Sequence, residues 1–143
     1  MKVPFALGRL LFGGYFLYNG INHFRNHKML SGYAQSKEVP QPDAAVALSG
    51  AALIVGGASI LLGVKPKLGT LAVMGFLAAV SPMMHDFWNV EDEQQRMGEM
   101  VNFTKNVALL GSGLMFLAIP APWPFSLSRR RIETATHVHP AHA

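Results

Sequence analysis

The sequence predicts an all-α integral membrane protein, built as an up-and-down bundle of four membrane-spanning helices with a short amphipathic interfacial helix between spans 1 and 2. Two observations predict this class. Half of the 143 residues are hydrophobic and only 14% are charged, whereas charged residues make up about 25% of a typical soluble domain. The apolar residues also form four long runs. Two of these runs lack the charged face that a helix of a soluble bundle carries.

Each run has about the 20 residues that a helix needs to cross the hydrocarbon core. The first covers residues 3–22 and contains Arg9, whose long side chain we expect to extend to the cytoplasmic interface. No small-residue cleavage site follows this run, so we expect a retained signal-anchor. The second covers residues 44–64 and has no charge. The third, residues 68–86, ends in His85 and Asp86, and the fourth, residues 101–119, contains Lys105 near its start.

The connections carry the expected start and stop signals. Pro42 and Asp43 suit the start of a helix, Gly63 and Pro66 bracket a tight turn, and three prolines follow the fourth run. Between the first two runs, one helical face gathers Met29, Leu30, Tyr33 and Ala34. This pattern predicts the short amphipathic helix, lying on the outer membrane surface.

Charge predicts the orientation. Four spans place both termini on one side, together with six basic residues: Lys2, Lys65, Lys67, Arg129, Arg130 and Arg131. The other side has four, diluted by acidic residues: Arg25, Lys28, Lys37 and Arg96. The positive-inside rule therefore predicts cytoplasmic termini. We expect residues 1–126 to form the membrane domain and residues 127–143 a disordered, basic cytoplasmic tail that contains histidines.

Composition also excludes several chemistries. The chain has no cysteine, which excludes disulfides, thiolate metal sites and dithiol redox chemistry within it. A basic stripe interleaved with stacking aromatic residues is absent, so no nucleic-acid partner is expected. We expect the chain to contact the lipid bilayer, and to associate either with other membrane protein subunits or with further copies of itself.

The polar residues of the spans are predicted to meet at the outer side. One face of the first span carries Tyr15, Asn19, Asn22 and His23, and one face of the fourth carries Asn102, Lys105 and Asn106. With His85 and Asp86, these residues would surround a pocket in the outer leaflet. A lysine inside a span costs about 3 kcal/mol unless it finds a partner or reaches the interface. We therefore predict that Lys105 pairs with Asp86, with His23 or His85 completing the network.

Other interpretations of the same residues stay open. Polar side chains at the ends of spans often only mark the interface. His23 and His85 lie at similar depth and could ligate a haem between them, and His137, His139 and His142 of the tail could bind a metal ion. We expect no metal site and no covalently bound cofactor, and we regard a quinone as the cofactor that this pocket would accept.

Four stretches resemble the DoxX family of small four-span bacterial membrane proteins: "GRLLFGGYFLYNGINHF", "LSGAALIVGGASILLGVKPKLGTLAV", "MHDFW" and "NFTKNVALLGSGLMF". The resemblance extends from about Arg9 to Ser128. His23 stands where many relatives have lysine, and Ser128 where they often have aspartate. The family includes DoxD, the quinone-linked small subunit of thiosulfate:quinone oxidoreductase, and proteins proposed to join membrane oxidoreductase complexes. The resemblance therefore implies a location in the bacterial inner membrane.

We compare three functions with these features of the sequence. The leading one is a membrane subunit of an oxidoreductase system that binds a quinone or a small anion in the outer pocket, with Lys105 and His85 as hydrogen-bond donors. If the protein is enzymatic, it would be a quinone-linked oxidoreductase subunit. The alternative is a purely structural subunit that packs against a larger complex. A transporter is disfavoured because no pair of charged residues lies near the middle of the spans.

Overall fold

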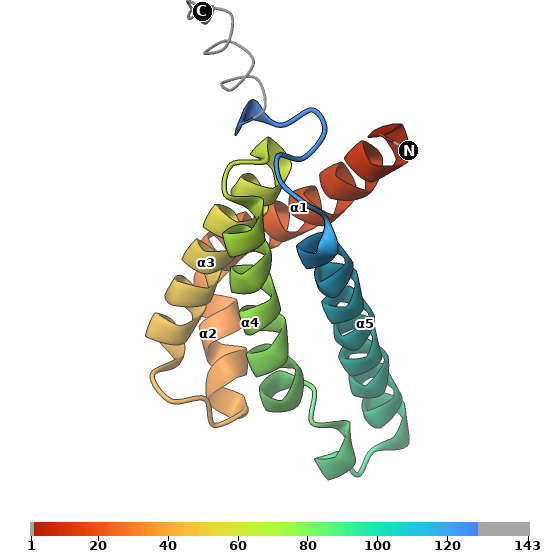
Figure 1. Ribbon diagram of the computed structural model, residues 1–143. Helices are drawn as coiled ribbons and strands as arrows, with labels where there is room; N and C mark the ends of the chain where they lie inside the picture. Colours follow the sequence, from red (N-terminus) through yellow and green to blue (C-terminus); the bar gives the residue numbers. More distant parts are fainter. Residues whose placement is uncertain (1, 129–143) are drawn as a thin grey trace, which may run out of the picture.

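The computed structural model describes residues 2–128, which contain α-helices, one short 3-10 helix and no strand (Figure 1). In chain order these are α1 (Lys2–Arg25), α2 (His27–Ser36), α3 (Pro42–Leu62), α4 (Pro66–Met84), η1 (Phe87–Asn89) and α5 (Glu93–Ala118). The predicted all-α class is confirmed.

The long helices pack side by side, each mainly against the next one. α1 packs most extensively against α3, α3 against α4, and α4 against α5, while α2 covers one end of α3 (Figure 1). Glycines permit the closest of these approaches, because a Cβ on Gly57 would meet the backbone of Gly13 and Leu17. Close packing of this kind replaces the hydrophobic driving force that helices lack in lipid.

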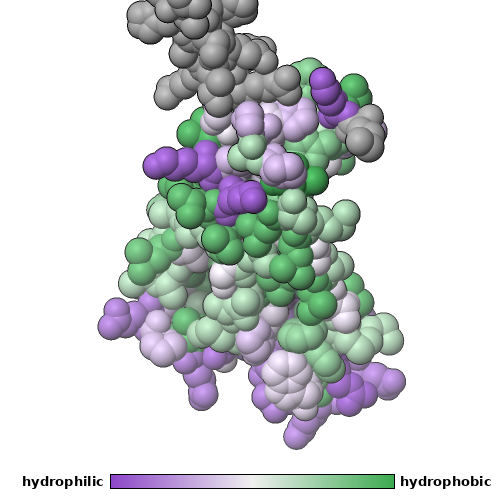
Figure 2. Space-filling model, viewed as in Figure 1, coloured by the Kyte–Doolittle hydropathy of each residue, from purple (hydrophilic) through white to green (hydrophobic). Residues whose placement is uncertain are grey.

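Within residues 2–128, three helical segments are long and apolar enough to cross a membrane: Pro42–Leu62, Pro66–Asn89 and Glu93–Ala118. Most of their side chains face outward, and Figure 2 shows mainly apolar residues between more polar ends. An apolar exterior is what a lipid environment favours. The helix α1 is not among the three, since Arg9 and several polar residues reduce its hydropathy.

The boundaries of the spans agree closely with the sequence in two cases and differ in the third. The runs 44–64 and 68–86 correspond to α3 and α4, each shifted by about one half-turn. α5 begins at Glu93, about two turns before the predicted start at residue 101. The cause is an N-cap: the side chain of Asp92 accepts a hydrogen bond from the backbone N–H of Gln95 at 2.7 Å.

Residues after α5 fold back over the end of the bundle where α1 begins. Trp123 is fully buried against Phe5 and Phe116. Arg9 is only 6% exposed and donates hydrogen bonds to the carbonyl oxygens of Pro124 and Phe125 at 2.9 and 3.0 Å. The returning segment therefore covers the Arg9 side chain and supplies its hydrogen-bond acceptors, so that the guanidinium is buried in the protein.

The predicted tail lies almost entirely outside the described residues. Its first two residues, Leu127 and Ser128, are described, and the Ser128 hydroxyl donates to the carbonyl oxygen of Gly63 at 2.9 Å. The three tail histidines and the three arginines from residue 129 onward lie outside the described residues.

Candidate functional site

A cavity of about 320 Å³ lies between α2, α3 and α4, next to the C-terminal part of α1. Four polar side chains contribute to its wall: His23, Tyr33, Ser49 and His85. The remaining lining residues are apolar: Leu30, Ala34, Val39, Ala45, Val46, Phe76, Ala79, Val80, Met83 and Met84. An apolar cavity with a few polar groups is typical of sites for lipophilic small molecules.

His85 is held at this cavity by a carboxylate from another helix. α4 ends at Met84, and the next residue, His85, places its Nδ1 2.7 Å from Oε2 of Glu99 on α5. The His85 and Glu99 side chains are only 18% and 11% exposed. A carboxylate at one ring nitrogen fixes the orientation of an imidazole and leaves the other nitrogen for a ligand.

The same carboxylate also binds α2. Oε1 of Glu99 accepts a hydrogen bond from the Tyr33 hydroxyl at 2.9 Å. Burial, and then the hydrogen bond to Glu99, raise the pKa of Tyr33 to about 12. The phenol therefore remains a proton donor at physiological pH, and Glu99 links α2 to α4 through its two oxygens.

A second link between α2 and the end of α4 is an ion pair. Nζ of Lys37, the residue directly after α2, lies 2.7 Å from Oδ1 of Asp86. The Asn89 side chain donates to Oδ2 of the same carboxylate at 3.1 Å. The Lys37 and Asp86 side chains are 15% and 25% exposed, so the pair is partly shielded from water. The two links hold α2 over the cavity.

The family model described as DoxX matches residues 5–86, which is more than half of the chain. The chain belongs to the DoxX family. No curated protein and no solved structure matches it. The matched segment begins in the first turn of α1, contains α2, α3 and α4, and ends at His85 and Asp86. Glu99 on α5 lies beyond it.

In this DoxX protein Asp86 pairs with Lys37, so the predicted pair between Lys105 and Asp86 is wrong. The amine of Lys105 instead donates to Oδ1 of Asn102 at 3.0 Å on an exposed face of α5. The face that packs toward α4 contains Glu99, Asn106 and Gly113, which recur every seven residues. The polar residues predicted to share one face of the fourth span therefore do not all point the same way: Asn106 is buried and Lys105 is exposed.

Of the predicted polar residues on α1, only His23 reaches the cavity. Its Nδ1 lies 2.7 Å from the carbonyl oxygen of Asn19, and its ring packs edge-on against Phe76. The Asn19 side chain donates to the carbonyl oxygen of Tyr15, and that of Asn22 accepts from Asn26. Asn19 and Asn22 are thus occupied by local hydrogen bonds.

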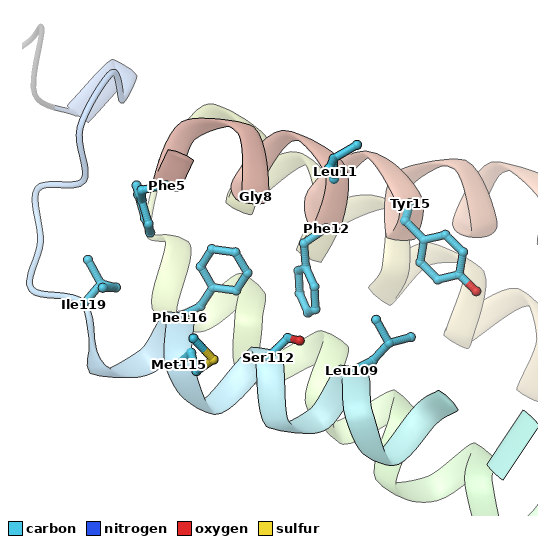
Figure 3. Close-up of a pocket in the computed structure, with 10 residues that line it drawn as sticks. All are labelled: Phe5, Gly8, Leu11, Phe12, Tyr15, Leu109, Ser112, Met115, Phe116 and Ile119. Carbon is cyan, nitrogen blue, oxygen red and sulfur yellow. The ribbon is translucent and has the colours of Figure 1, made fainter. Parts of the chain in front are cut away.

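Tyr15 belongs to a different cavity of this DoxX protein, which lies between α1 and α5 and has a volume of about 470 Å³. Figure 3 shows Phe12 and Phe116 projecting between the two helices. Only Tyr15 and Ser112 contribute polar side chains to its lining, and neither forms a charged pair there. Its mainly apolar walls would therefore accommodate a hydrocarbon chain.

Three residues of the site were missed from the sequence: Tyr33, Lys37 and Glu99. Glu99 precedes Asn102 by three residues and Asn106 by seven, so helical spacing could have placed it on their face. The predicted fourth span begins only at residue 101, and Glu99 lies outside it. Tyr33 on α2 and Lys37 directly after it are four residues apart, a spacing that places both on one helical face. Within residues 2–128 no group of three His, Asp or Glu side chains could hold a metal ion.

Proposed function

We propose that this DoxX protein spans the bacterial inner membrane four times and binds a quinone headgroup in the cavity beneath α2, as a subunit of a membrane oxidoreductase system. The observation that carries the proposal is the pair between His85 and Glu99 at 2.7 Å, located at the wall of an otherwise apolar cavity. An oriented imidazole beside apolar walls matches a ligand that has a carbonyl oxygen on its headgroup ring and a hydrocarbon side chain.

The fourth span in this proposal is α1. Its 24 residues would extend about 36 Å, which exceeds the roughly 30 Å of the hydrocarbon core. Arg9, the charged residue that reduces its hydropathy most, is buried and hydrogen-bonded to carbonyl oxygens within the protein. The helix therefore would not expose this charge to lipid.

Charge supports the proposed orientation. All acidic residues within residues 2–128 lie at the end of the bundle that contains the cavity: Glu38, Asp43, Asp86, Glu91, Asp92, Glu93 and Glu99. The opposite end contains Lys2, Lys65 and Lys67, and Arg129, Arg130 and Arg131 follow residue 128 in the sequence. These six basic residues outnumber the four at the cavity end, Arg25, Lys28, Lys37 and Arg96, so the positive-inside rule gives cytoplasmic termini. The cavity would open in the outer leaflet, with α2 lying at the outer interface.

The hydrogen-bond partners indicate what each imidazole offers a ligand. A carbonyl oxygen can only accept, so Nδ1 of His23 donates to Asn19 and its Nε2 is left as an acceptor. We assign the proton between His85 and Glu99 to Nδ1 of His85. A neutral His85 would then accept a hydrogen bond from a hydroquinone hydroxyl through Nε2. With a proton on both ring nitrogens, His85 would instead donate one to a quinone carbonyl through Nε2.

Direct binding of a quinone tests the proposal. Purified protein in detergent is titrated with a decyl-substituted benzoquinone, and the dissociation constant is obtained from the quenching of tryptophan fluorescence. His85→Leu should weaken binding about tenfold, the usual effect of losing a hydrogen bond to a charged or polarised group. Lys105→Gln, on the exposed face of α5, is the matched control and should bind as the wild type does. Equal affinity of His85→Leu and the wild type would refute quinone binding here.

A structural subunit is the second candidate, and the apolar cavity between α1 and α5 favours it. A Cβ added to Gly8 in its wall, or to Gly75 on α4, would meet no atom within 4 Å. Gly8→Leu should therefore fill the cavity without disturbing the chain itself. Loss of co-purifying membrane proteins from Gly8→Leu, with retention by the Gly75→Leu control, would support this candidate. Retention by both variants would contradict it.

A further inference from the structure

Arg9 is a buried cation without a countercharge in the described part of the chain. Its residue is 6% exposed, and its two hydrogen bonds go to the uncharged carbonyl oxygens of Pro124 and Phe125. None of the salt bridges within residues 2–128 includes it. A buried charge is costly unless an opposite charge compensates it. These contacts use two of the five N–H donors of a guanidinium.

The guanidinium lies at the depth where two spans end. A Cβ added to Gly63, in the turn between α3 and α4, would lie 3.2 Å from Nη1 of Arg9. The same turn carries Lys65 and Lys67, both exposed. All acidic residues of the described chain lie at the opposite end of the bundle. In a bilayer, this end of α3 and α4 would lie near the lipid headgroups rather than at the midplane.

A cavity of about 280 Å³ lies beside Arg9. Its other lining residues are apolar: Val3, Ala6, Leu7, Leu10, Leu61 and Phe125. One cation bordering a hydrocarbon surface matches the two parts of a phospholipid, a phosphate and an acyl chain. A soluble anion would use only the cation and gain nothing from the apolar wall.

We propose that this cavity binds an anionic phospholipid, with its phosphate on Arg9 and one acyl chain along Leu7, Leu10 and Leu61. Guanidinium groups bind phosphate through parallel hydrogen bonds of matching geometry. Lys65 and Lys67 would add attraction for a headgroup with net negative charge. The lipid would thereby compensate Arg9 and anchor the positively charged end of the bundle in its leaflet. The site is independent of the quinone cavity, which lies at the other end of α3.

The test compares two lipids that differ only in the headgroup, which is anionic in one and zwitterionic in the other. Full-length protein in detergent is mixed with phosphatidylglycerol or phosphatidylcholine of identical chains, and bound lipid is counted by native mass spectrometry. We expect the wild type to prefer phosphatidylglycerol about tenfold, in line with charge-assisted hydrogen bonding. Arg9→Gln should abolish this preference. Arg25→Gln, which removes an exposed arginine at the opposite end, should retain it.

A second variant keeps the test decisive if Arg9→Gln fails to fold, since Arg9 also holds Pro124 and Phe125. Ala6→Trp fills the cavity and leaves the Arg9 side chain in place, and it too should lose the preference. A preference that persists in folded Ala6→Trp would overturn the proposal. Removal of the wild-type preference by excess inorganic phosphate, with phosphate bound in place of lipid, would also overturn it in favour of a free-anion site.

Discussion

Glu99 on α5 lies 2.7 Å from His85 at the end of α4, and this contact joins the two helices at the wall of the candidate quinone cavity. The second oxygen of Glu99 accepts from Tyr33 on α2. One carboxylate therefore connects α5 to α2 and to the end of α4.

Glu99→Ala should destabilise the protein, because it leaves Nδ1 of the mostly buried His85 without its partner and removes one hydrogen bond from the Tyr33 hydroxyl. The expected loss is about 1–3 kcal/mol in the free energy of unfolding, measurable as a lower midpoint of thermal unfolding in detergent. Glu91→Ala removes an exposed carboxylate at the same end of the bundle and serves as the control. If both variants unfold at the same temperature as the wild type, the Glu99 network does not stabilise the fold.

The pair between Lys37 and Asp86 should contribute a measurable coupling energy. A double-mutant cycle with Lys37→Met and Asp86→Asn isolates this interaction from the other effects of each substitution. Because both side chains are largely shielded from water, we expect about 1 kcal/mol, the upper end of the range for exposed pairs. The coupling should decrease as salt is added. Strictly additive effects of the two substitutions would show that the pair adds no stability.

Tyr33 gives the protein a predicted pH dependence at alkaline pH. Its pKa is raised from 10.0 to about 12, first by burial and then by the hydrogen bond to Glu99. Below the unfolded value, both states keep the phenolic proton and the stabilisation is complete. As the pH rises from about 10 to about 12, the unfolded chain loses the proton while the folded chain retains it. The free energy of unfolding should therefore fall over this range.

Ultraviolet absorbance of tyrosinate measures this titration. The chain has three tyrosines, so the difference between the wild-type curve and that of Tyr33→Phe isolates the one of interest. A difference curve with its midpoint near the ordinary tyrosine value would mean that the Tyr33 hydroxyl does not donate to Glu99 in the folded protein.

The approach of α1 to α3 should be intolerant of larger residues. A Cβ on Gly57 would lie 2.8 Å from the carbonyl oxygen of Gly13, a separation that real Cβ atoms essentially never show. Gly57→Ala should therefore reduce the free energy of unfolding by about 1–3 kcal/mol, as overpacking typically does. Gly14→Ala is the matched control, because a Cβ there meets no atom within 4 Å. Equal stability of the two variants would contradict this packing.

The positions of the helices were largely predictable because their signals are local. The length of an apolar run can be read from the run itself, as can the prolines and glycines that bracket it. For this reason α3 and α4 agree with residues 44–64 and 68–86 to about two residues. The start of α5 was missed because the N-cap Asp92 is followed by two polar turns rather than by apolar residues.

By itself, the sequence determined an all-helical membrane protein of the DoxX family and brought His23 and His85 to the same end of the bundle. Only the tertiary structure decided which polar side chains meet. Consecutive residues of a helix differ by about 100° in direction, so a small uncertainty in the rotation of a helix changes which of its side chains faces a neighbour. For this reason Lys105 points outward, and Lys37, which follows α2 in a distant part of the chain, pairs with Asp86.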